Sequence, residues 1–250
     1  LKCDVVILDE MSMVDVKLFQ ALIAALRYSC RILMVGDADQ LPSVGPGNIL
    51  GEVIRSERVP TVCLNEIFRQ AARSLIVENA HRIISGEPLK KGRKTDDFVF
   101  LEADGDAARQ LVCDLVTTRL PRSYGFDPIR DIQVLCPTKL GPTGTQALNV
   151  ELQNLLNPPQ KGKPQLQSAA RVFRVGDRIM QTRNDYHVVW QKDDGTVGTG
   201  MFNGDVGRIV EIDQSGEWLA LDFDRRTDPY STEILSENAL AYPQTVHKPQ

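Results

Sequence analysis

The first part of the chain combines short apolar runs with one helical stripe. Residues 5–8 form a continuous apolar run that ends abruptly at Asp9, and residues 32–35 form a second run that ends at Gly36. Between them, residues 14–26 place leucines at four-residue intervals, which is the spacing of one helix face. Continuous apolar runs are typical of parallel strands buried on both faces. This order, with a further helix over residues 49–54, predicts a doubly wound α/β sheet.

A second block of alternating elements follows. Its apolar runs predict strands at residues 61–64, 98–101 and 132–136. Helical spacing predicts helices at residues 74–84, 107–120 and 144–156. Because strands and helices continue to alternate, this block is again typical of a parallel sheet.

The pattern changes at about residue 171. Short strand patterns follow one another without helices, at residues 172–182, 207–213 and 218–223. Turn dipeptides such as Asn203-Gly204 and Ser215-Gly216 separate them. This part predicts a small β barrel or sandwich, inserted into or appended to the α/β body. Residues 239–242 predict a strand that returns to the second block.

Composition narrows the class of protein. The chain has 250 residues, 42% hydrophobic and 25% charged, which is typical of a soluble globular protein with one or two domains. With 29 basic and 33 acidic residues, the net charge of -4 excludes a histone-like basic protein but allows a local basic groove. No apolar run is long enough to span a membrane. The five widely spaced cysteines indicate reduced core thiols in a cytoplasmic protein.

The first candidate chemistry is the carboxylate pair Asp9-Glu10. It follows a predicted parallel strand, at the sheet edge where α/β proteins bind ligands. Nucleotide hydrolysis uses such a pair, one carboxylate holding Mg²⁺ and the next orienting or deprotonating the attacking water. The same residues also suit an acidic turn in which Asp9 or Ser12 caps the following helix. The residue pair alone does not distinguish the catalytic role from the helix-capping role.

Two further polar residues suit phosphate chemistry. Gln40 lies in Gly36-Asp37-Ala38-Asp39-Gln40, after the second predicted strand, and its neutral amide can contact a terminal phosphate without competing for the metal. Arg69 opens the second block, where a guanidinium can stabilise charge on a transferring phosphoryl group. A surface pair with Glu66, three residues earlier, is the alternative for Arg69.

Several motifs occur in a recognisable order. Residues 9–15 read Asp-Glu-Met-Ser-Met-Val-Asp, and residues 36–47 begin Gly-Asp-Ala-Asp-Gln and end Gly-Pro-Gly. They are followed by the segments at residues 64–70, 136–158, 175–207 and 241–250. In this order they resemble superfamily 1B helicases, most closely the RecD-like DNA helicases: motifs II, III and IV, the second-domain pattern, the barrel insertion and the start of motif V.

The resemblance implies a fold and a domain plan. We expect an α/β protein with two RecA-like parallel-sheet motor domains, the first one partial, and a small SH3-like β-barrel insertion. The implied boundaries are residues 1–58 for the end of the first motor domain, 59–168 for the second, 169–238 for the barrel, and 239–250 for the return to the second motor domain.

The resemblance also implies roles for matching residues. Asp9 is expected to hold Mg²⁺, Glu10 to act as the catalytic base, and Gln40 and Arg69 to contact the γ-phosphate of ATP. Single-stranded DNA is expected to run along Thr138, Lys139, Thr145, Thr245, His247 and Lys248. Hydroxyl, amide and ammonium groups suit a grip on phosphates that ignores base sequence. Without the resemblance, turn and cap chemistry is the reading that we favour for Thr138 and Thr145.

The chain departs from the family pattern in one respect. A nucleoside triphosphatase of this type needs a phosphate-binding loop that ends in Gly-Lys-Ser or Gly-Lys-Thr, whereas here Gly162-Lys163 is followed by Pro164. In the family, that loop lies before motif II in the sequence. Motif VI lies after motif V. We therefore expect an internal portion of a larger helicase, inactive as an ATPase by itself.

Several functions stay open at this point. The leading expectation is an ATP-dependent helicase that translocates 5′ to 3′ on single-stranded DNA, meets duplex junctions and works with repair or recombination subunits. The alternatives are the helicase part of a conjugative relaxase, a subunit of an exonuclease V-type complex, and a non-catalytic nucleic-acid-binding module.

Overall fold

The computed structural model describes residues 1–64, 74–93, 96–168, 171–192, 195–213, 215–223 and 226–246. The chain divides into two compact units, unit 1 from Leu1 to Phe100 and unit 2 from Leu101 to Gln250.

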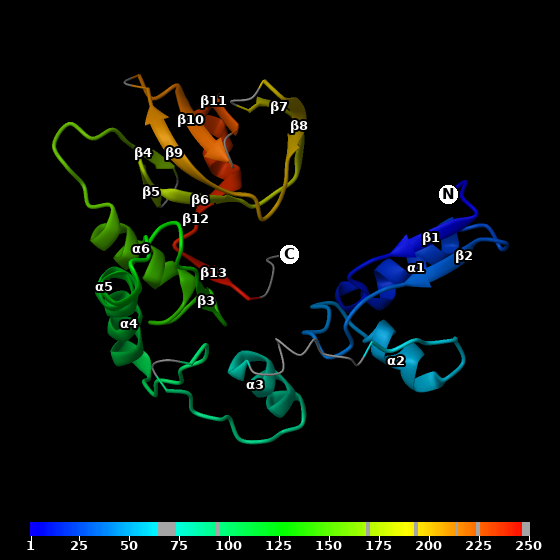
Figure 1. Cartoon of the computed structure of the whole chain (residues 1–250). Helices are drawn as coiled ribbons and strands as arrows, with labels where there is room; N and C mark the ends of the chain where they lie inside the picture. The colour runs from blue at the N-terminus through cyan, green and yellow to red at the C-terminus, as the bar shows by residue number, and fades with distance from the viewer. Residues whose placement is uncertain are drawn as a thin grey trace. The chain divides into compact units, whose positions relative to one another are not determined.

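Unit 1 contains a short parallel sheet and its helices. In chain order its elements are β1 (Val5–Leu8), η1 (Met11–Met13), α1 (Val16–Ala25), β2 (Arg31–Met34), α2 (Ile49–Ser56) and α3 (Leu75–Ile84). β1 and β2 lie side by side in parallel, with Val5 paired to Arg31 and Leu8 to Met34 (Figure 1). The predicted parallel arrangement of these two strands is therefore confirmed.

In the part of the chain that the structure describes, only one face of this sheet is covered. Val5, Ile7 and Leu33 are 53%, 67% and 53% exposed, whereas their neighbours Val6 and Ile32 are half-buried. The expectation of burial on both faces is therefore wrong in unit 1. An apolar run makes a strand suitable for burial on both faces. Both faces are buried only where a packing layer covers each of them.

Unit 2 begins with α/β structure. Its first elements are α4 (Gly105–Asp114), the π-helical turn η3 (Leu115–Arg119), α5 (Leu120–Tyr124), β3 (Val134–Cys136) and α6 (Thr145–Leu156). The last strand of the chain, β13 (Pro243–Thr245), pairs in parallel with β3. The predicted return of the chain to the second α/β block is thus observed, carried by a strand slightly later than the expected residues 239–242.

The middle of unit 2 is antiparallel. Its elements are β4 (Gln165–Ser168), β5 (Arg171–Arg174), β6 (Arg178–Gln181), β7 (Asp185–Gln191), β8 (Val197–Met201), β9 (Val206–Ile212), β10 (Trp218–Phe223), β11 (Arg226–Ser231), η4 (Thr232–Glu237) and β12 (Asn238–Leu240). Five of these strands form one sheet in the order β11-β10-β9-β6-β12, and β4-β5 and β7-β8 form separate two-stranded ladders (Figure 1). The predicted small β domain is confirmed.

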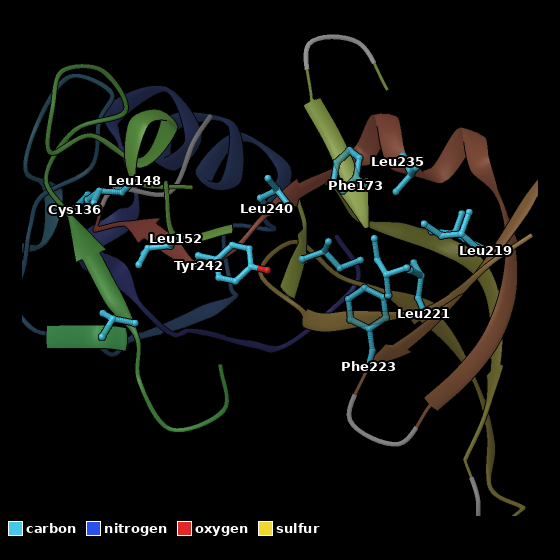
Figure 2. Close-up of a cluster of buried hydrophobic side chains, with 14 of the residues drawn as sticks. Cys136, Leu148, Leu152, Phe173, Leu219, Leu221, Phe223, Leu235, Leu240 and Tyr242 are labelled. Carbon is cyan, nitrogen blue, oxygen red and sulfur yellow. The ribbon is translucent and has the colours of Figure 1, made fainter. Parts of the chain in front are cut away.

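The hydrophobic core of unit 2 joins its two parts. Leu148 and Leu152 of α6 belong to the same buried cluster as Phe173, Leu221 and Phe223 of the β strands (Figure 2). Each fully buried side chain of this size contributes about 1.5–3 kcal/mol relative to an exposed one. The antiparallel strands and the α/β part of unit 2 therefore share one core.

Two predicted strands are absent. Residues 61–64 and 98–101 are irregular, and Val62 and Leu64 are 87% and 96% exposed. A short apolar run becomes a strand only where another strand offers its backbone groups, and the sequence does not show whether one is near. The cysteine expectation is correct for Cys113 and Cys136, which are buried, but wrong for Cys63, which is exposed.

Candidate active site and nucleic-acid interface

The first candidate site lies at the carboxyl edge of the β1–β2 sheet. Beyond the strands the backbone ladder continues, since the Val35 amide donates to Leu8 O at 2.8 Å and the Met11 amide to Val35 O at 3.0 Å. Asp9 and Glu10 therefore leave the sheet beside the segment that starts at Gly36. The structure brings the two predicted acidic motifs to one edge.

Glu10 has an unusual backbone. Its φ and ψ are 55° and 42°, in the left-handed region. Glu57 is the other non-glycine residue with positive φ among the described residues, and there the conformation ends helix α2. Left-handed backbone is unfavourable for a glutamate, and such strained positions cluster at functional sites. The turn directs the chain from Asp9 into the 3-10 helix η1.

The capping alternative for the acidic pair is wrong. Helix α1 is capped by Asp15, whose carboxylate accepts the Leu18 amide at 2.7 Å. Glu10 precedes η1 without a side-chain cap bond, and Asp9 accepts only the amide of its neighbour Glu10, at 2.9 Å. Asp9 and Glu10 are both exposed. Neither carboxylate of the pair therefore caps a helix.

Asp37 organises the loop that carries Gln40. Its carboxylate accepts the Asp39 amide at 3.0 Å and the Gln40 side-chain amide at 3.3 Å. Sequence reasoning assigned Asp37 no role, although a Gly-Asp pair directly after a strand was the available signal. Asp37 positions Gln40 at the same edge as Asp9 and Glu10.

Gly36 allows the two segments to approach. A Cβ atom at Gly36 would lie 2.9 Å from the Met11 backbone nitrogen and 2.9 Å from Leu50 Cδ2. Any larger residue would push the Asp37 loop away from the η1 turn. The glycine is thus required for the geometry of this edge.

The donor set at this edge fits Mg²⁺. Magnesium is usually bound through one or two carboxylates, with waters and substrate phosphates completing its shell. Asp9 and Asp37 are exposed carboxylates. They lie on two neighbouring segments, which backbone hydrogen bonds join at Leu8, Met11 and Val35. Among the described residues, no group of three or more His, Cys, Asp or Glu side chains is placed to hold a metal ion. Waters and substrate phosphates would therefore have to complete the shell.

The second candidate site lies at the carboxyl edge of the β3–β13 sheet. Thr245 pairs with Cys136, and the Val246 amide donates to Cys136 O at 3.0 Å. The chain leaving β3 then carries Thr138 and Lys139. Because the two strands are parallel, residues far apart in sequence come to the same edge.

The loop after β3 closes on helix α6. The amides of Thr145 and Gln146 donate to the carbonyls of Thr138 and Lys139 at 3.2 and 3.1 Å. The Thr138 hydroxyl donates to Leu140 O at 2.9 Å, so turn chemistry accounts for this hydroxyl. The structure thus brings together Thr138, Lys139, Thr145 and Thr245, with the Lys139 side chain exposed.

Three predicted site residues are not part of this description. Arg69, His247 and Lys248 lie outside the described residues. Their roles stay predictions.

No helix in the described part of the chain combines the length and the apolar character needed to cross a membrane.

Two protein families match parts of the chain. Residues 1–105 match the family described as an AAA domain. Residues 148–223 match the family described as the SH3 domain of ATP-dependent RecD-like DNA helicases.

Curated relatives match almost the whole chain. The ATP-dependent RecD2 DNA helicase of Deinococcus radiodurans is 34% identical over 247 residues, which are 99% of this chain and 31% of that protein. The RecBCD enzyme subunit RecD of Mycolicibacterium smegmatis is 25% identical over 261 residues, covering 99% of this chain and 43% of that protein. The chain therefore spans less than half the length of these relatives. The resemblance to RecD-like helicases is confirmed.

A solved structure has the same fold. The crystal structure of the Pif1 helicase from Bacteroides, in complex with ADP-AlF3 and ssDNA, superposes with a TM-score of 0.54 at 16% sequence identity. The match covers 99% of this chain and 62% of that chain. This likeness, with the SH3-domain match, supports the predicted fold class, α/β structure with parallel sheets and an SH3-like part.

Proposed function

Because the chain is a relative of the RecD-like helicases along nearly its whole length, we propose that it forms part of an ATP-driven motor that moves along single-stranded DNA. Unit 1 supplies residues that act on the nucleotide, and unit 2 supplies residues that grip the strand. The observation that carries the proposal is the edge of the β1–β2 sheet, where Asp9, Glu10 and the Asp37–Gln40 pair lie together.

Each residue at this edge has a separate task. Asp9 and Asp37 would hold Mg²⁺, which supplies charge neutralisation on the phosphates of ATP. Glu10, exposed and fixed by its left-handed backbone, accepts a proton from the attacking water. Gln40, oriented by Asp37, offers its amide to the terminal phosphate. We assign Arg69 the contact with the γ-phosphate that its motif predicts.

The edge of the β3–β13 sheet would contact DNA. Lys139 supplies a positive charge in the loop after β3, and Thr145 and Thr245 belong to α6 and β13, which flank this loop. Ammonium and hydroxyl groups suit phosphate oxygens. We include His247 and Lys248, which follow Thr245 in the sequence, in the same track. Contacts of this type grip the backbone without reading bases.

Finer features are also proposals. We propose 5′ to 3′ movement, unwinding of duplexes at junctions, and work in DNA repair or recombination beside other subunits. Free cysteines are typical of a reducing compartment, and we propose a cytoplasmic location on that basis. We keep the domain plan of residues 1–58, 59–168, 169–238 and 239–250 as part of the proposal.

The test is the substitution Glu10→Gln in the complete protein. Hydrolysis of ATP, measured in the steady state with single-stranded DNA present, should fall by orders of magnitude because the amide cannot accept the proton. Binding of a fluorescent ATP analogue should change little.

The chain offers a matched control. Glu57 is also exposed and also has left-handed backbone, with a φ of 54° against 55° for Glu10. Glu57→Gln should therefore leave hydrolysis at the wild-type rate. Near wild-type hydrolysis in Glu10→Gln, or an equal loss in both variants, would show that Glu10 is not the catalytic base.

A further inference from the structure

Asp177 is a buried carboxylate at the centre of a hydrogen-bond network. It lies in the turn between β5 and β6 and is 0% exposed. Oδ1 accepts from Asn157 Nδ2 at 2.6 Å and from the Tyr242 hydroxyl at 2.9 Å. Oδ2 accepts from Gln153 Nε2 at 2.6 Å and from the Arg174 amide at 2.7 Å. Both oxygens are fully used by donors.

The donors come from three separate parts of unit 2. Gln153 belongs to helix α6, and Asn157 follows its last turn. Arg174 ends β5, within the antiparallel part. Tyr242 directly precedes β13 and lies 65 residues from Asp177 along the chain. One side chain therefore connects the antiparallel part to helix α6 and to the residue that directly precedes β13.

The network requires an ionised acceptor. Four donors can be satisfied only by a carboxylate that offers all its lone pairs, because a protonated acid would present a donor of its own. No ion pair to Asp177 occurs among the described residues, and its direct partners are these four hydrogen-bond donors. A buried charge held in this way is costly to disturb, and its partners are fixed in position.

Tyr242 is the contact that leads to the DNA edge. It is 4% exposed and lies in the shared core with Leu148 and Leu152 (Figure 2). Burial and the charge of Asp177 raise the pKa of its hydroxyl, which therefore stays protonated and donates. Its backbone amide donates to Asn149 Oδ1 of α6 at 3.1 Å. Tyr242 thus fixes the start of the strand that ends at Thr245.

We propose that Asp177 is a positioning residue for DNA binding: through Tyr242 and Gln153 it fixes β13 and α6, so that Thr245 and Thr145 stay aligned with Lys139. The proposal rests on the proposed function, since it concerns the DNA track assigned there. Asp177 does not touch DNA, because it is buried within unit 2. Its effect reaches the track through the two elements that it holds.

The test is Tyr242→Phe in the complete protein, which removes one donor and keeps the ring. Hydrogen–deuterium exchange should accelerate in residues 244–246, where the Val246 amide closes the ladder to Cys136. The dissociation constant for a fluorescein-labelled oligothymidine, measured by anisotropy, should rise about threefold to tenfold, as expected for one buried hydrogen bond. Asp177→Asn should weaken binding further, since one of the two acceptor oxygens becomes an NH2 group that cannot accept its two donors.

Two controls separate positioning from general stability. Leu219→Ala removes a fully buried side chain of β10 without touching the network, and should lower the melting temperature while DNA affinity stays within about twofold. Tyr186→Phe removes an exposed hydroxyl that accepts from Asn184, and should change neither exchange nor affinity.

The outcomes are distinct. Unchanged exchange in residues 244–246, or equal losses of affinity in Tyr242→Phe and Leu219→Ala, would overturn the positioning role while leaving the proposed function intact. Failure of the wild-type protein to bind the oligothymidine would overturn the proposed function itself. Accelerated exchange with weaker binding in Tyr242→Phe, and in neither Leu219→Ala nor Tyr186→Phe, is the result that supports the inference.

Discussion

Replacing Gly36 by alanine tests whether close backbone contact builds the candidate active site. The new Cβ atom would lie 2.9 Å from Leu50 Cδ2, 2.9 Å from the Met11 nitrogen and 3.2 Å from Met11 Cβ. Non-bonded carbon contacts are optimal at about 3.5–4.0 Å, so each neighbour must move by several tenths of an ångström. Leu50 can rotate, but the Met11 nitrogen is held by its bond to Val35 O.

The free-energy cost of Gly36→Ala is the difference between two opposing contributions. Inserting a methyl group into a filled site costs about 1–3 kcal/mol. Loss of glycine flexibility in the unfolded chain returns about 0.4–1 kcal/mol, because Gly36 is not among the glycines with positive φ. The net cost is roughly 1–2 kcal/mol, a factor of about 5–30 in the population of the locally opened state.

Hydrogen exchange is the suitable assay for this change. Both tryptophans, Trp190 and Trp218, lie in unit 2, so fluorescence does not follow unit 1. Exchange of the Met11 and Val35 amides should accelerate by the factor above, and ATP hydrolysis by the complete protein should fall because Asp37 and Gln40 are displaced.

A second substitution identifies which contact matters. Leu50→Ala removes the Cδ2 contact but leaves the Met11 backbone in place, so Gly36→Ala should still accelerate exchange in that background. No additional effect in the Leu50→Ala background would show that backbone contact with Met11 is not the constraint. Wild-type exchange and hydrolysis in Gly36→Ala alone would refute the role of Gly36 altogether.

Two further predictions concern unit 2. Lys139→Ala should lower the slope of log affinity against log salt by about 0.7 for single-stranded DNA, whereas Lys161→Ala, also exposed, should leave it unchanged. An equal change in both variants would remove Lys139 from the track. Burial and the nearby Glu151 carboxylate raise the pKa of the Cys113 thiol from 9.0 to about 11. The folded state therefore holds this proton more tightly than the unfolded state, and its contribution to stability is complete below pH 9 and is lost as the pH rises to about 11. Urea midpoints measured across this range should fall less steeply for Cys113→Ala than for the wild type; parallel curves would contradict the burial argument.

The local chemistry of the first candidate site could be predicted from the sequence. Apolar runs that stop at Asp9 and Gly36 placed two polar motifs at strand ends, and the structure puts both at one sheet edge. The left-handed conformation of Glu10 could not be predicted, because nothing about a glutamate favours it. It depends on how η1 is held against Val35 and Gly36.

The second candidate site depended more on tertiary structure. The motif order indicated Thr138 and Thr245 as members of one track, but only the pairing of β13 with β3 brings Cys136 and Thr245 together. The turn bond of the Thr138 hydroxyl, which the residue type alone favours, is also present. Local residue preference and long-range pairing thus act on the same loop.

The sequence by itself determined the strands and helices of residues 5–56, the antiparallel strands that follow residue 171, and the identity of the polar residues at strand ends. Those features arise from side-chain spacing, which acts over a few residues. Tertiary structure alone decided that residues 61–64 and 98–101 remain irregular and that Asp177 meets Gln153 and Tyr242. Such outcomes depend on which backbone and side-chain partners folding brings within hydrogen-bond distance, and the spacing of residues along a chain does not contain that information.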